Sequence, residues 1–468
     1  MDMLLDNVVA AQPDEVVPVV HLILHLGHVR LPRAVPESLG VVCAIHGMKH
    51  ASRIGSRIAP ILMARNFSKA VSTTMNVFHC DHCGQLVFFE NTVCVKCGNT
   101  LAYLPDLGDM GSLNPAGAGL WRSPLPRAEG RLYRLCDNYT QHNVCNWVVR
   151  DDDPNTLCQS CRLTRVIPNL SRPGNKESWY KLEVAKRRLV YTLLALGCPV
   201  ESKFEKPERG LAFEFLADPA NGAPPVLTGH ADGLITLNVA EADEVERERR
   251  RLRLHEPYRT LLGHFRHEVG HYYWDRLIKD SPLIDDFRER FGDERQDYDQ
   301  ALQQHYDQGP RIDWQQQFVS AYASVHPWED WAETWAHYLH MTDTLETAAA
   351  CGLTLRPRRA DEPTLKSPPP ALPATRFAAF DGLIDDWFPL TYVLNNLNRG
   401  MGLPDGYPFV LSPPAVEKLK FVHKTLNAGA MSGSSPHSDS SPSLRGRRQL
   451  NGTSRSADRQ PGYRPVSP

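Results

Sequence analysis

His267-Glu268-Val269-Gly270-His271 lies in a segment with helical spacing of apolar residues, which we predict to be one helix from Pro257 to about Asp280. Residues four apart lie on one face of a helix, so the two imidazoles can bind one zinc ion. The Glu between them can reach a water on that ion and accept its proton. The alternative is an ordinary helix surface, but it would bury two histidines among apolar side chains without a partner, which is costly. The pattern therefore predicts a zinc site at His267 and His271, with Glu268 as general base.

A third ligand is expected further along the chain, because a hydrolytic zinc site uses three protein ligands and keeps the fourth position open. The segment His326-Pro-Trp-Glu-Asp-Trp-Ala-Glu-Thr-Trp-Ala-His337 should form a helix after Pro327. Glu329 and Glu333 would then lie one turn apart. We predict that Glu329 binds the zinc and that Glu333 hydrogen-bonds and orients a ligating histidine.

Other assignments remain open in this segment. His337 and His340 compete with Glu329 as the third ligand, and the whole segment also fits a Trp-rich core helix with solvated acids. Tyr322, just upstream, is a candidate donor to the oxyanion that forms on a substrate carbonyl. A Tyr beside a helix is more often a core residue, so this assignment rests on position alone.

Most of the 11 cysteines fall in CxxC pairs, which indicates metal binding in a reducing compartment rather than a disulfide framework. The first set is Cys80-Asp-His-Cys83 and Cys94-Val-Lys-Cys97. Two such knuckles present four thiolates from two tight turns and close a tetrahedral zinc site. Gly84 and Gly98 directly follow the knuckles, where the backbone must turn sharply. We predict a structural zinc ribbon here.

A second four-cysteine zinc site is predicted from Cys136, Cys145, Cys158 and Cys161, of which only the last two form a CxxC pair. In the alternative, Cys136 and Cys145 are ordinary buried thiols. Three further cysteines stand alone and are predicted to be packing residues: Cys43, Cys198 and Cys351. The expected zinc content is thus one catalytic ion and one or two structural ions.

The order of elements predicts an α+β fold of two modules. Residues 75–170, rich in cysteines and turn formers, should be a zinc-ribbon module with little apolar core. Residues 171–428 should form a mainly helical domain with a small β-sheet, and the long connection from His271 to Glu329 implies an inserted subdomain at about 281–320. Residues 1–74 are either a loosely ordered extension or upstream sequence before a natural start at Met75, and residues 429–468 are expected to be disordered.

The charge of the chain bears on its partners and its compartment. The chain has 468 residues and a formal net charge of −2. This balance gives no reason to expect binding to nucleic acid or to an anionic membrane, and the charges near the knuckles are mixed rather than basic. No apolar run reaches the roughly 18 residues of a membrane span. We therefore expect a cytoplasmic protein whose ribbon is structural or docks another protein.

Two segments resemble the gluzincin type of zincin metallopeptidase: His267–His271 with the following Tyr-Tyr-Trp-Asp, and Glu329-Asp-Trp-Ala-Glu333 with the following Thr-Trp-Ala-His-Tyr-Leu-His. With the ribbon Phe-His-Cys-Asp-His-Cys-Gly-Gln-Leu-Val-Phe-Phe-Glu-Asn, the chain from Met75 to Asn427 is similar to bacterial zinc-ribbon-containing zinc-binding metallopeptidases. The resemblance implies a zincin-like domain in which Glu329 is the third ligand, Glu333 supports a zinc histidine and Tyr322 assists at the carbonyl.

The residues and the resemblance together predict a zinc-dependent peptidase acting on a peptide or protein substrate. A strand expected at 233–239 is a candidate sheet edge for pairing with an extended peptide. The rival from another class is a non-catalytic zinc-binding interaction protein with a zincin-like fold. It would hold metal at His267 and His271 without hydrolysing peptides.

Overall fold

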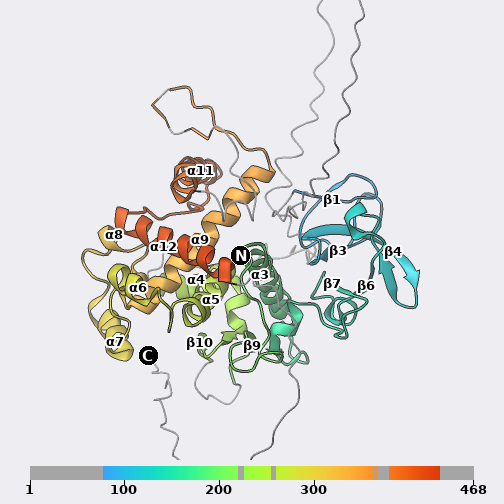
Figure 1. Cartoon of the computed structure of the whole chain (residues 1–468), viewed down its shortest axis with the longest axis horizontal. Helices are drawn as coiled ribbons and strands as arrows, with labels where there is room; N and C mark the ends of the chain where they lie inside the picture. The colour runs from blue at the N-terminus through green and yellow to red at the C-terminus, as the bar shows by residue number, and fades with distance from the viewer. Residues whose placement is uncertain are drawn as a thin grey trace, which may run out of the picture. The chain divides into compact units, whose positions relative to one another are not determined.

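The computed structural model describes residues 77–219, 226–253, 260–359, 361–362, 364–365 and 379–432 (Figure 1). The predictions for residues 1–74, including Cys43, lie outside the described residues, as do those for residues beyond 432. The last described helix, α12 (Pro413–Ser432), continues past residue 428 into the segment predicted to be disordered. The described residues form an α+β fold in which a cysteine-rich module of strands precedes a mainly helical domain.

The cysteine-rich module contains two sheets. A short hairpin pairs β1 (Phe78–His79) with β2 (Leu86–Val87), and a five-stranded antiparallel sheet follows. The strands of that sheet, in order, are β3 (Thr100–Leu104), β4 (Asp109–Gly117), β5 (Leu120–Arg122), β6 (Leu132–Leu135) and β7 (Val148–Arg150), with α2 (Asp137–Thr140) between the last two. Leu104, Leu113 and Tyr133 are buried together on it. The prediction of little apolar core is therefore wrong, because short strands gather apolar side chains from distant positions.

The mainly helical domain carries a four-stranded sheet with the order β10-β11-β9-β8, of which β8 is contributed by the end of the cysteine-rich segment. Both β8 (Thr164–Val166) and β11 (Leu234–Asn238) run parallel to β9 (Ala212–Leu216), whereas β10 (Gly229–Ala231) runs antiparallel to β11. β11 is the strand predicted at 233–239, but it lies inside the sheet. The prediction that it is a free edge is wrong, because the three-residue strand β10 pairs with its outer side.

Two long helices pack closely in this domain, α5 (Leu261–Leu277) and α9 (Pro327–Ala350). The indole Nε1 of Trp331 on α9 donates to the carbonyl of Gly270 on α5 at 2.9 Å. A Cβ atom at Gly270 would lie 2.9 Å from Ala332 Cα, so the close approach of the two backbones requires a glycine. The glycine within the His-Glu-Val-Gly-His motif thus lets the two helices meet.

The remaining helices of this domain are α3 (Asn175–Ala195), α4 (Glu244–Arg253), α6 (Ile284–Phe291), α7 (Tyr298–Gln308), α8 (Trp314–Gln317), α11 (Phe380–Gly400) and α12. α6, α7 and α8 occupy the connection between α5 and α9, where an inserted subdomain was predicted (Figure 1). α5 begins at Leu261 rather than at Pro257, because the Thr260 hydroxyl accepts a hydrogen bond from the Gly263 N–H and caps the helix. Across the described residues, no helix is both long and apolar enough to cross a membrane.

Helix α3 contacts the cysteine-rich module through charged and aromatic side chains. Arg187 Nη1 donates to the Val144 carbonyl at 2.5 Å, and Arg188 Nε pairs with Glu90 Oε1 at 2.6 Å. The ring of Tyr191 packs edge-on against Phe89, with centroids 5.5 Å apart. Because the two rings belong to one continuous buried cluster, the module shares a core with the helical domain.

Candidate metal centres

The first cysteine set has the spacing of a closed zinc site. Cys80 Sγ lies 3.7 Å from Cys97 Sγ, and Cys83 Sγ lies 3.6 Å from Cys94 Sγ. Zinc–sulfur bonds of about 2.3 Å in a tetrahedron place neighbouring sulfurs about 3.8 Å apart, whereas a disulfide would bring them to about 2 Å. Gly84 and Gly98 have positive φ angles of 71° and 74°, as the tight turns after each knuckle require. The four thiols therefore fit one zinc ion.

The second cysteine set is more deeply buried and equally compact. Its four ligating sulfur atoms lie within 4.8 Å of one another, and Cys145 Sγ is 3.7 Å from Cys158 Sγ. Backbone N–H groups donate to three of the sulfurs: that of Cys158 to Cys136 Sγ, that of Trp147 to Cys145 Sγ, and that of Cys161 to Cys158 Sγ. Burial and then the neighbouring thiols raise the pKa of Cys158 well above its usual value in the absence of metal. Metal binding here must therefore release protons.

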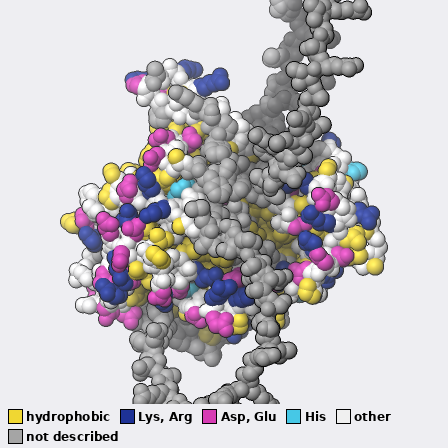
Figure 2. Space-filling view, in the orientation of Figure 1, with side chains coloured by type: hydrophobic (Ala, Val, Ile, Leu, Met, Phe, Trp, Pro, Cys, Tyr) yellow, Lys and Arg dark blue, Asp and Glu magenta, His cyan; other side chains and the backbone are white. Residues whose placement is uncertain are grey.

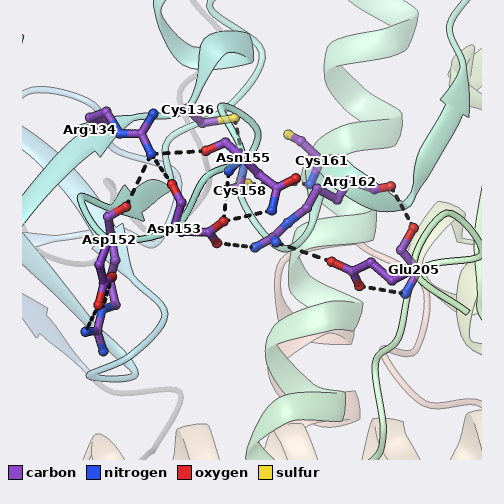
Figure 3. A network of polar contacts seen from close by, with 11 residues as sticks. Arg134, Cys136, Asp152, Asp153, Asn155, Cys158, Cys161, Arg162 and Glu205 are labelled. Carbon is purple, nitrogen blue, oxygen red and sulfur yellow. Dashed lines mark hydrogen bonds and ion pairs between the residues drawn. The ribbon is translucent and has the colours of Figure 1, made fainter.

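A polar network fixes the loop that carries this second set (Figure 3). Arg162, next to Cys161, pairs with Asp153 at 2.9 Å and with Glu205 at 3.4 Å. Asp153 also accepts from the Asn155 backbone and side chain, so the carboxylate holds both ends of the loop. Arg134, two residues before Cys136, donates through Nη2 to the Asn155 carbonyl at 3.3 Å, so the same loop is tied to the segment that carries Cys136.

The third centre joins α5 to α9. His267 Nε2 lies 3.2 Å from His271 Nε2 and 3.0 Å from Glu329 Oε2, and His271 Nε2 lies 3.5 Å from the same oxygen. Zinc bonds of about 2.0–2.1 Å to nitrogen and oxygen give tetrahedral edges of about 3.3 Å. The donor atoms are thus spaced as zinc ligands, and Glu329 Oε2 is buried beside both histidine nitrogens. We refer to His267, His271 and Glu329 as the trio.

One carboxylate and one hydroxyl hold the trio from outside. Glu333 Oε1 is 2.7 Å from His267 Nδ1, as predicted for a residue that orients a ligating histidine, and Ser320 Oγ donates to the other oxygen of Glu333 at 2.6 Å. Tyr298, the first residue of α7, donates its hydroxyl to Glu329 Oε1 at 2.6 Å and leaves Oε2 for the metal. Neither Ser320 nor Tyr298 is predictable from the sequence, because no spacing rule relates them to the motif.

The ionisation states in the trio follow from burial and from pairing. Burial alone would lower the pKa of His267, but Glu329 and Glu333 outweigh it and raise that pKa well above its usual value. Burial alone would raise the pKa of Glu333, but the contact with His267 outweighs it and lowers that pKa to about 2. Without metal, His267 is therefore an imidazolium that pairs with both Glu329 and Glu333. An incoming zinc ion must displace the proton from His267 Nε2.

The predicted catalytic groups lie beside the trio. Glu268 is 6% exposed on α5, and His264 Nε2, one turn earlier, is 3.6 Å from its Oε1. The ring centroid of Tyr322 is 5.9 Å from that of His267. Burial and then the charge of Glu329 raise the pKa of Tyr322 well above its usual value, so the hydroxyl keeps its proton. The structure therefore places the Tyr322 ring beside His267, and the charge of Glu268 also acts on the Tyr322 hydroxyl.

The competing ligands make other contacts. His337 Nδ1 is 2.7 Å from the Tyr407 hydroxyl, and His340 Nδ1 is 2.5 Å from an Arg266 guanidinium nitrogen. Neither histidine joins the trio. Of the lone cysteines, Cys198 is buried as predicted, whereas Cys351 is exposed. The packing prediction for Cys351 is wrong, because α9 ends one residue earlier and leaves it on the helix end.

Aromatic rings form one wall of the trio. The Trp328 ring packs on His271 with centroids 3.9 Å apart, and the His230 ring of β10 lies 6.2 Å from His271 and 6.1 Å from Trp328. Burial and then the nearby His271 lower the pKa of His230 to about 3, so this imidazole is neutral near pH 7. The wall thus combines apolar ring faces with ring N–H groups.

A family model described as "Putative zinc-binding metallo-peptidase" matches residues 175–425, which include the trio. The chain belongs to this metallopeptidase family. A zinc-ribbon domain model matches residues 77–172 of the same chain, and the resemblance predicted from the motifs is thereby confirmed. Uncharacterized proteins of Mycobacterium bovis and Mycobacterium tuberculosis are 42% identical to it over 365 residues, which is 78% of this chain and 99% of each relative. No solved structure matches it significantly.

Proposed function

We propose that the chain is a zinc-dependent peptidase that hydrolyses peptide bonds, with its catalytic zinc on His267, His271 and Glu329. The trio carries this proposal: its three ligating atoms lie within 4.8 Å of one another and come from two helices locked together at Gly270. A zinc site that serves only stability closes with four protein ligands, as both cysteine sets do. In the described part of the chain, no fourth His, Cys, Asp or Glu joins the trio, so a position stays open for water or substrate.

Each neighbouring side chain has a proposed role. Zinc at this site supplies a Lewis acid that makes a water nucleophilic near neutral pH. Glu268 accepts a proton from that water and later gives it to the leaving amine. Tyr322, which keeps its proton, donates a hydrogen bond to the substrate oxygen as negative charge develops there. Glu333 holds His267 in one orientation, and Ser320 holds Glu333.

The sheet edge proposed for substrate is β10 rather than β11. Among the described strands of this sheet, β10 is an outer one, and its His230 lies close to the ring of His271. An extended peptide can add a strand to such an edge through main-chain hydrogen bonds. We therefore place the substrate backbone along Gly229–Ala231.

The ribbon is proposed to be structural, with two zinc ions, and to offer a docking surface for protein. Val93 and Val95, on either side of Cys94, are 51% and 88% exposed. On the face shown in Figure 2, Lys and Arg side chains lie interspersed with Asp and Glu, and this mixture does not favour a nucleic-acid backbone. A protein partner or substrate therefore fits the ribbon better than nucleic acid.

The decisive experiment compares Glu268→Gln with the wild-type protein on denatured β-casein and a broad peptide library. Gln keeps the size of Glu268 but cannot take a proton, so cleavage should fall about 100- to 10,000-fold while zinc per chain stays constant. Glu289→Gln, which changes an exposed acid on α6, is the matched control. Equal cleavage by wild type and Glu268→Gln would contradict the mechanism. A zinc-loaded wild type that cleaves nothing would instead support the non-catalytic interaction protein.

A further inference from the structure

The imidazole of His230 has one nitrogen that the fold uses and one that it does not. Its Nε2 accepts a hydrogen bond from the backbone N–H of Gly233 at 2.9 Å, across the turn between β10 and β11. A backbone N–H can only donate, so Nε2 carries no proton, and a neutral ring must carry its hydrogen on Nδ1. The turn therefore fixes both the tautomer and the orientation of this ring.

The Nδ1–H donor of His230 is buried and has no hydrogen-bond partner in the part of the chain that the structure describes. Trp328, whose ring centroid is 6.1 Å away, has a buried Nε1–H in the same condition. Buried donors without partners are rare in folded proteins because they lose their hydrogen bonds to water. Two such donors lie on neighbouring rings next to His271, where an acceptor oxygen would satisfy them.

We propose that His230 Nδ1–H donates a hydrogen bond to a backbone carbonyl oxygen of the peptide substrate, which makes His230 a substrate-binding residue. The inference rests on the proposed peptidase function and identifies one specific contact with its substrate. A peptide paired with β10 presents carbonyl oxygens along the same strand that carries His230, next to the ring of His271. Carbonyl oxygens are acceptors only, which matches a wall that offers only donors.

Two substitutions at this position separate the roles of the two nitrogens. His230→Gln can keep an acceptor for the Gly233 N–H, in the place of Nε2, but it loses the donor at Nδ1. His230→Asn can keep a donor near Nδ1 but loses the contact with Gly233. Each variant is therefore the matched control of the other. The probe is a blocked Pro-Leu-Gly hydroxamate, which carries backbone carbonyls and can bind zinc.

The readouts are the dissociation constant of the hydroxamate and zinc per chain, both on the zinc-loaded protein. His230→Gln should weaken hydroxamate binding about fivefold or more, His230→Asn should weaken it less, and the zinc content should be equal in all three proteins. Equal affinities would overturn the proposal, because the Nδ1–H donor would then contribute nothing to hydroxamate binding. A larger loss in His230→Asn than in His230→Gln would also overturn it, because the ring would then serve only the turn.

The same proteins distinguish this proposal from the peptidase function. Hydroxamate affinity tests the contact of His230 without requiring turnover, whereas β-casein cleavage by wild type and Glu268→Gln tests the chemistry. If the hydroxamate depends on His230 but no substrate is cleaved, the carbonyl contact stands and the peptidase function fails. If cleavage depends on Glu268 but hydroxamate affinity does not depend on His230, the peptidase function stands and the carbonyl contact fails.

Discussion

The ribbon and the trio are two ways to build a zinc site in one chain. Cys80 and Cys97 are 17 residues apart, and their site closes with four identical ligands. His267 and its supporting Glu333 are 66 residues apart, and the trio offers only three ligands. A closed site of nearby ligands can fold around its metal, whereas an open site must be held by the fold. We therefore expect that loss of the ribbon zinc unfolds the ribbon locally, whereas loss of zinc from the trio leaves the protein folded.

The largest effect is expected from Cys80→Ser/Cys83→Ser, which removes half of the first ribbon site. The apparent binding free energy of a structural zinc is about 10–16 kcal/mol and is part of the folding free energy. The variant should lose one zinc ion and the hydrogen-exchange protection of β1 and β2, while the zinc at the trio remains. Hydrogen exchange with mass spectrometry and elemental analysis measure both. If the β1–β2 hairpin stayed protected without its zinc, the ribbon would not need the metal to fold, and the proposed difference between the two sites would be wrong.

The next effect concerns the support of the trio. Glu333→Gln removes the carboxylate that accepts from His267 Nδ1 and should lower zinc affinity at that site about 10- to 100-fold, with the ribbon ions unaffected. Competition with a zinc chelator, followed by elemental analysis, measures this loss. Ser320→Ala, which removes only the hydroxyl that donates to Glu333, should have a smaller effect in the same direction. Unchanged zinc affinity in Glu333→Gln would mean that the fold alone holds His267.

A smaller effect is expected where α5 meets α9. Gly270→Ala places a Cβ 2.9 Å from Ala332 Cα, so the helices must separate, and the free energy of unfolding should fall by about 1–3 kcal/mol. The control is Gly382→Ala on α11, where an added Cβ meets nothing within 4 Å and helix propensity should leave stability equal or higher. Chemical denaturation measures both. Equal stabilities would show that the helix contact at Gly270 is loose.

The two regions also differ in how far the sequence predicted them. The ribbon knuckles and the His-Glu-Val-Gly-His segment were predictable, because their residues are brought together by one turn or one helix. Glu329 and Glu333 followed from helical spacing and from family resemblance, and the structure brings both to the histidines.

What the sequence did not predict depends on contacts between distant segments. Tyr298 and Ser320 reach the carboxylates from the connection between α5 and α9, where no motif marks them. β10 is a three-residue strand that exists only through its pairing with β11. The sequence alone therefore predicts β11, rather than β10, at the edge of the sheet. The core of the five-stranded sheet was not predicted, because four of its five strands have only three to five residues and show little alternation.

The central claim is that the trio holds a zinc ion separate from those of the cysteines. Elemental analysis of the wild-type protein and of His267→Ala/His271→Ala, both purified under the same conditions, tests it most directly. We expect about three zinc ions per chain in the wild type and about two in the variant, which should stay folded because both four-cysteine sites are intact. An unchanged zinc count in a folded variant would contradict the account, because the cysteines would then hold all the metal.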